Sequence, residues 1–274
     1  MALLSKYCLS LTAVVLLACQ GQEASTEYKR QQEADSLFKL ERNYFQGSSE
    51  SQELLQRVID LDSTHDDALR EIAIPFLKRG MPHLWKPLYD KAVAQDPQTW
   101  VPMRGYLYLL FYRDYQKALA DFSASDTLTH HLDHPQGHSV DYWRGITYLC
   151  MEQPEDAITF FDRHIAAVTE AIGEDWLELE AFLYRGIAHQ QRSNHPKAMA
   201  DFEKTIKLFK SSAEAHFYWA KSCIAQGEHT KASGLLDMSL ADYNRKMRLH
   251  HNYVEMPYTI YISDIETLRA SLTQ

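Results

Sequence analysis

The chain has 274 residues, of which 45% are hydrophobic and 24% charged, a composition that is ordinary for a folded globular protein. Its 37 acidic and 28 basic residues give a formal net charge of −9. No basic stripe is therefore expected that could displace counterions from phosphates, which argues against a nucleic-acid partner.

The N-terminus has the pattern of a secretory signal, and we expect residues 1–18 to be removed. One positive charge, Lys6, precedes a mostly apolar run of about 12 residues, which is too short to span a bilayer as a helix. The run ends in Leu16-Leu17-Ala18-Cys19, which resembles the lipobox of bacterial lipoproteins. This resemblance implies that Cys19 carries the lipid, palmitate included. The alternatives are an ordinary signal followed by a chance cysteine, or an uncleaved anchor.

Residues 19–31 are predicted to be a flexible tether, because the stretch after the cysteine is polar. Within residues 20–26 the only acidic residue is Glu23, so the segment lacks the acidic run that resembles a surface-export signal. We therefore expect a lipid anchor in the outer membrane, with the protein facing the periplasm. Cys150 and Cys223 lie in apolar helical segments and are expected to be buried thiols rather than a disulfide.

Residues 32–246 contain a repeated pattern in which a glycine is followed by an alanine 12 or 13 positions later and an aromatic residue four positions after that. The pattern begins at Gly105, Gly145 and Gly186, and neighbouring units keep related residues at a similar spacing. A residue without a side chain lets a second helix pack closely, and alanine and phenylalanine one turn apart face it. The members are Ala118 with Phe122, Ala157 with Phe161 and Ala198 with Phe202.

This pattern resembles the tetratricopeptide repeat (TPR) family. The resemblance implies an all-α fold, a right-handed α-solenoid of about six helix–turn–helix repeats. Two longer spacings indicate insertions at residues 123–138 and 167–177. Residues 247–274 are predicted to cap the array, with a final helix within residues 258–272.

In this family, side chains of the first helix of each repeat line a groove that grips peptides. The resemblance therefore implies a partner-binding groove, of whose members about half are expected to be accessible, while the others pack as core. Its predicted members are Arg70, Tyr106, Tyr142, Gln190, Gln191, Phe217 and Lys221. The arginines that precede the three repeat glycines are expected to pack their stems between helices and to reach water or a carbonyl with their heads.

Candidate chemistry is sparse. His130, His131, His134 and His138 could ligate a metal, but a proline and a glycine between them interrupt the helix that would align the rings. The sequence contains neither a G-x-S-x-G elbow nor a G-x-G-x-x-G loop. We therefore expect no metal, no cofactor and no enzymatic activity.

The best interpretation of the sequence is a membrane-anchored TPR lipoprotein that acts as a scaffold for a protein or peptide partner in the bacterial envelope. The partner's identity is not encoded in any recognisable motif. The alternative is a lipoprotein that binds a glycan or a small molecule, because aromatic side chains on a groove also stack against sugars.

Overall fold

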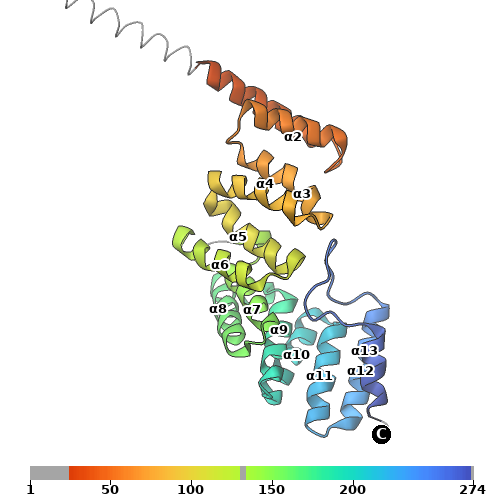
Figure 1. Cartoon of the computed structure of the whole chain (residues 1–274). Coiled ribbons are helices and arrows are strands. Elements are labelled where there is room, and N and C mark those ends of the chain that lie inside the picture. The colour runs from red at the N-terminus through yellow and green to blue at the C-terminus, as the bar shows by residue number, and fades with distance from the viewer. Residues whose placement is uncertain (1–24, 130–133, 273–274) are drawn as a thin grey trace, which may run out of the picture. The chain divides into compact units, whose positions relative to one another are not determined.

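A computed structural model describes residues 25–129 and 134–272, and all regular structure within these ranges is helical (Figure 1). The chain divides into two compact units, Met1–Pro97 and Gln98–Gln274. Within the described ranges, no helix has both the length and the apolar character that crossing a bilayer requires. The predicted signal peptide and Cys19 lie outside the described residues.

The described part of the first unit consists of two helical hairpins. Its first helix covers residues 25–41, so that helical structure begins inside the segment predicted as a tether. The others are α2 (Ser49–Leu61), α3 (Asp66–Lys78) and α4 (Pro82–Gln95). The core that joins the first three helices contains Ala34, Phe38, Leu55, Val58, Ala68 and Ile72.

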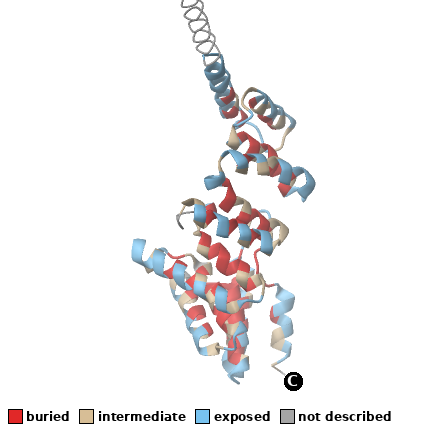
Figure 2. Ribbon diagram, turned by 60° about the vertical axis from the view of Figure 1, so that its left-hand side comes forward, coloured by how far each residue is buried: buried red, intermediate tan, exposed pale blue. Residues whose placement is uncertain are grey.

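The second unit, described by itself, consists of four hairpins and a final helix. Its elements are α5 (Pro97–Leu107), which ends in the π-helical turn η1 (Tyr108–Tyr112), α6 (Tyr115–Thr129), α7 (Val140–Cys150), α8 (Pro154–Ile172), α9 (Leu179–Gln191), α10 (His195–Phe209), α11 (Ala213–Ala225), α12 (His229–Asn244) and α13 (Ile262–Ala270). Within a unit, the buried residues line the sides on which the helices meet (Figure 2). Helical hairpins packed in sequence order confirm the predicted all-α repeat fold.

The repeat glycines fit tightly against the phenylalanine of the following helix. A Cβ atom at Gly105 would lie 2.7 Å from the Phe122 ring, and one at Gly186 would lie 2.6 Å from the Phe202 ring. Gly145 has the same relation to its own phenylalanine. The predicted register of the repeats is therefore confirmed, and its physical cause is the close approach of two helices.

The arginines that precede these glycines form ion pairs, which the sequence analysis did not anticipate. Arg104 pairs with Asp121 through two hydrogen bonds of 2.7 and 2.8 Å. Arg185 binds Asp201 in the same way, at 2.6 and 2.9 Å. In each of these two repeats the aspartate directly precedes the packing phenylalanine, so the pair ties the first helix to the second. Arg144 pairs with Asp126 and Asp141 and also donates to the carbonyl of Phe122, the kind of contact that was expected.

Both predicted insertions lie between hairpins. The first contains the short 3-10 helix η2 (Pro135–Gly137), and its residues 130–133 are outside the described part of the chain. The second lengthens α8 and adds the 3-10 helix η3 (Glu174–Trp176). The C-terminal helix α13 packs on α12, which confirms a capping helix at this end.

Candidate binding face

The first helices of the four hairpins in the second unit, α5, α7, α9 and α11, form what we call the first-helix face. Contacts join α7 to α9 and α9 to α11 directly. Between α12 and α13, residues 247–261 form neither helix nor strand, and we call them the return loop. In Figure 1 this loop is the blue segment that leaves α12 and comes back to α13. Its hydrogen bonds, described below, place it on the first-helix face.

Tyrosine hydroxyls of the array hold the centre of the loop by its main chain. Tyr184 on α9 donates to the carbonyl of Pro257 at 3.1 Å. Tyr218 on α11 donates to the carbonyl of Tyr258, also at 3.1 Å. Burial raises the pKa of both tyrosines above the ordinary value. Both hydroxyls are therefore protonated at neutral pH and act as donors. These contacts do not depend on the loop's side chains.

The two ends of the loop meet at Glu214, near the start of α11. This carboxylate is fully buried and accepts the backbone N–H of Leu249 at 3.0 Å. Burial raises the pKa of Glu214, and hydrogen bonds from the main chain of Leu249 and Ile260 partly oppose the rise. At the far turn of the loop, the Arg113 guanidinium donates to the carbonyl of Glu255. The array therefore contacts the loop's backbone at both ends and in the middle, and the N–H of Ala213 also donates to the carbonyl of Met247 at 2.8 Å.

Two side chains of the loop are recognised specifically. The Nε2 atom of His251 lies 3.0 Å from the Tyr106 hydroxyl. The hydroxyl of Tyr258 donates to the carbonyl of Leu149 at 2.9 Å and accepts from Gln191 at 2.8 Å. The Tyr258 ring also meets those of two array tyrosines edge to face, at centroid distances of 6.4 and 6.3 Å. The side chain of Tyr258 is therefore the loop's main anchor.

The three aromatic members of the predicted groove are largely buried. Tyr106, Tyr142 and Phe217 are only 5%, 1% and 8% exposed. The Tyr142 ring is packed between helices, whereas the hydroxyl of Tyr106 is bonded to the loop's own histidine. These rings are core or covered surface, because the large aromatic side chains also fill the space between successive hairpins.

The polar members of the predicted groove remain accessible. Gln191 and Lys221 are exposed, and Arg70 and Gln190 are half-buried. Gln190 donates to the carbonyl of Tyr218 at 2.7 Å and so joins α9 to α11, whereas Gln191 faces the loop. Arg70 lies on α3 in the first unit. Glu214 and the return loop were not predicted from the sequence, in which the only signal for the loop is the aromatic and proline content of residues 253–261.

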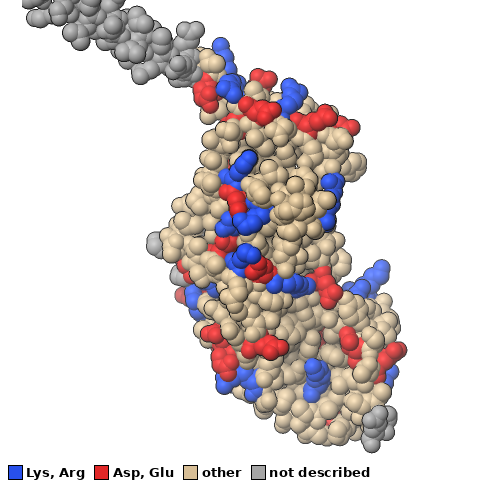
Figure 3. Space-filling model, in the orientation of Figure 1, with Lys and Arg blue, Asp and Glu red and all other residues tan. Residues whose placement is uncertain are grey.

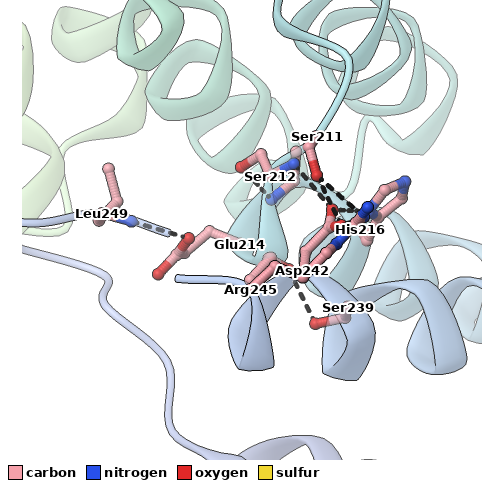
Figure 4. A network of polar contacts seen from close by, with 10 residues as sticks. Ser211, Ser212, Glu214, His216, Ser239, Asp242, Arg245 and Leu249 are labelled. Atoms are coloured by element: carbon pink, nitrogen blue, oxygen red, sulfur yellow. Dashed lines mark hydrogen bonds and ion pairs between the residues drawn. The ribbon is translucent and has the colours of Figure 1, made fainter. Parts of the chain in front are cut away.

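A buried polar network fixes the base of the loop (Figure 4). Asp242 of α12 is 1% exposed and accepts from Ser211 Oγ at 2.6 Å, from the backbone N–H of Ser212 at 2.9 Å and from Arg245. Its second oxygen also lies 2.9 Å from Nδ1 of His216. Hydrogen bonds to the charged form outweigh burial and lower the pKa of Asp242. The network locks α12 against the start of α11, where Glu214 holds the loop.

Acid is expected to destabilise the protein partly through His216. Burial lowers the pKa of this imidazole, so the folded ring stays neutral at pH values where the unfolded one is protonated. Stability is therefore lost as the pH falls from the ordinary histidine pKa of about 6.5. Urea unfolding at pH 7.5 and 5.5 measures this loss of stability. The loss should be smaller in His216→Asn than in the wild type, because asparagine keeps a hydrogen-bond donor but does not titrate. The exposed His229→Asn is the control, and equal losses in both variants would contradict the assignment.

A cavity of about 840 Å³ lies beside the insertions, between the start of α7, the end of α8 and η3. At its wall, Ser139 Oγ lies 2.8 Å from Nδ1 of His164, whose Nε2 lies 2.8 Å from Glu178. The other oxygen of Glu178 lies 2.9 Å from His138. Burial would raise the pKa of Glu178, but these hydrogen bonds outweigh it and hold the pKa well below its usual range.

Serine, imidazole and carboxylate in a chain can activate a nucleophile. Here the Ser139 hydroxyl also accepts the N–H of Tyr142 at 3.2 Å and caps α7, which is the usual use of a serine at this position. Among the residues that the structure describes, no group of three or more histidine, cysteine or acidic side chains is arranged so that it could hold a metal ion. His138 is bonded to Glu178, and His130 and His131 lie outside the described residues.

Charges of both signs alternate over the face seen in Figure 3, without a broad field of one sign. Several basic side chains of the described residues are paired with a carboxylate, for example Arg185 with Asp162 at 2.7 Å. Such a surface offers no continuous cationic track along which a phosphate backbone could lie.

Comparison of the sequence with protein-family models and with curated proteins gives no match. Solved structures show the fold. PilW, described as a widely conserved type IV pilus biogenesis factor, is similar with a TM-score of 0.64 and 14% identity, over 86% of this chain and 98% of PilW. YrrB, a TPR protein with an unusual peptide-binding site, has a TM-score of 0.52 and 17% identity, over 70% of this chain and 94% of YrrB.

A chain of the APC/C hetero-tetramer Cut9–Hcn1 is similar with a TM-score of 0.61 and 15% identity, over 82% of this chain. The present chain spans only 39% of its length. At these identities the likeness concerns the fold. The fold of this chain is that of the TPR proteins.

Proposed function

We propose that this protein is a lipid-anchored, non-catalytic scaffold that holds a non-helical segment of a partner protein on its first-helix face in the bacterial envelope. One observation carries the proposal: this face already binds a non-helical stretch of polypeptide through that stretch's main chain. The fold supports it, because stacked hairpins offer a preformed surface on which a flexible segment can be ordered. The likeness to PilW, a pilus biogenesis factor, is consistent with the envelope.

A charge reversal on the face tests the scaffold. Lys221 is exposed on α11, whereas Lys207 is exposed on α10, a second helix. We expect Lys221→Glu to reduce recovery of cross-linked partner from envelope fractions several-fold, because a rim charge sets encounter and register. Lys207→Glu should leave recovery unchanged. An equal effect of both reversals, or of neither, would count against the first-helix face.

Lipidation at Cys19 is tested separately. We expect Cys19→Ser to move the mature chain from the membrane to the soluble fraction or to leave it as unprocessed precursor. Several acyl chains together give stable membrane attachment, and serine cannot carry the lipid that the cysteine thiol would hold. The measurement is fractionation together with incorporation of labelled palmitate. Membrane association and labelling that are both unchanged in Cys19→Ser would rule out this anchor.

A further inference from the structure

The contacts of the return loop indicate what kind of partner segment the first-helix face would bind. This inference rests on the proposed function and deepens it. We propose that the return loop occupies the binding site of the first-helix face, and that a partner binds by displacing it with a non-helical segment that makes the same turn and carries a tyrosine or phenylalanine at the position of Tyr258.

The first step of the argument is that the array recognises main chain rather than sequence. Three donors, on Tyr184, Tyr218 and Arg113, each reach a carbonyl of the loop, and Glu214 accepts one of its N–H groups. The loop turns at Tyr258, whose φ is 63°, and any polypeptide that makes the same turn has carbonyls and N–H groups in these places. The same four bonds are therefore available to a segment of another protein.

The second step is that one site selects a side chain. The Tyr258 ring is bordered by the rings of Tyr184 and Tyr218. Its hydroxyl makes two hydrogen bonds, one accepted from the Gln191 amide and one donated to the Leu149 carbonyl. Such a site fits an aromatic ring, and the Gln191 and Leu149 contacts favour a hydroxyl at its end. A partner segment is thus expected to place a tyrosine, or less favourably a phenylalanine, there.

The third step is that the loop can move without unfolding a helix. Residues 247–261 are without helix or strand, so their release breaks no regular structure. The loop is anchored on both sides, by α12 and by α13, so α13 can stay on the array while the loop moves. A segment tethered at both ends acts at high effective concentration, which keeps the face closed to weak ligands.

The experiment uses a fluorescein-labelled synthetic peptide with the sequence of residues 248–261 and the purified full-length protein, with anisotropy as the readout. We expect weak binding to the wild type and binding at least 10-fold tighter to Tyr258→Ala, whose own loop has lost its anchor. Asn252→Ala, at an exposed position of the same loop, is the matched control and should bind like the wild type. If circular dichroism shows that Tyr258→Ala has lost helix, His251→Ala replaces it.

Two further variants test the contacts themselves. In the Tyr258→Ala background, Tyr184→Phe together with Tyr218→Phe keeps both rings but removes the donors, and should weaken the peptide at least 10-fold. Tyr148→Phe removes the hydroxyl of a tyrosine on another helix, α7, and should leave peptide binding unchanged. A peptide in which alanine replaces the tyrosine that corresponds to Tyr258 should also bind at least 10-fold more weakly than the unchanged peptide.

The inference would be overturned if the wild type and the Tyr258→Ala protein, or the His251→Ala protein used in its place, bound the peptide equally, or if neither bound it. So would unchanged binding after removal of both hydroxyls. These outcomes are distinct from failure of the scaffold proposal, in which the peptide behaves as expected but Lys221→Glu leaves recovery of envelope partners unchanged.

Discussion

Asp242→Ala is expected to lower the free energy of unfolding by about 3 kcal/mol or more, because it removes the acceptor of a buried network. The substitution leaves Ser211, the Ser212 N–H and His216 without the carboxylate that they share. Each buried donor deprived of its acceptor costs about 1–3 kcal/mol. Urea denaturation followed by circular dichroism measures the change.

Asp237→Ala on the same helix is the matched control. The Asp237 side chain is 68% exposed, and its ion pair with Arg269 lies at the surface. Exposed ion pairs contribute about 0–1 kcal/mol, so this variant should unfold close to the wild type. If Asp242→Ala were as stable as Asp237→Ala, the network would not be what holds α12 to the start of α11.

Gly186→Ala is expected to destabilise the protein by about 1–2 kcal/mol, although alanine is the better helix former. A helix interior normally gains about 1 kcal/mol from this change. Here the new Cβ would lie 2.6 Å from the ring of Phe202, which is fully buried and cannot move aside. Overpacking of this kind typically costs 1–3 kcal/mol or more, so it outweighs the gain in propensity. Thermal unfolding measures the difference.

Gly234→Ala gives the comparison in the opposite direction. Gly234 lies within α12, and a Cβ there would have nothing within 4 Å. Only the propensity effect then remains, and the variant should be as stable as the wild type or more stable by up to about 1 kcal/mol. Stabilisation by both substitutions would mean that the repeat glycines are not needed for close packing.

The sequence alone was enough to predict the helical repeat and its register. Glycine, alanine and phenylalanine recur at a nearly fixed spacing, and in a helical hairpin this spacing puts them in one local contact. Gly105 with Phe122 and Gly186 with Phe202 meet as expected, because the two members of each pair lie in adjacent helices of the same hairpin. A capping helix at the C-terminus was likewise predictable from its apolar spacing.

The state of the groove was decided only by the tertiary structure. Tyr106 sits at a groove position in its own repeat, but its accessibility depends on His251, which is 145 residues further along the chain. Tyr142 is buried by rings from two other helices. Sequence periodicity describes neighbours one helix away, whereas burial is the sum over every segment that packs against a residue. The return loop has no period of its own, and only its contacts with Glu214, Tyr184 and Tyr218 reveal that it covers the first-helix face.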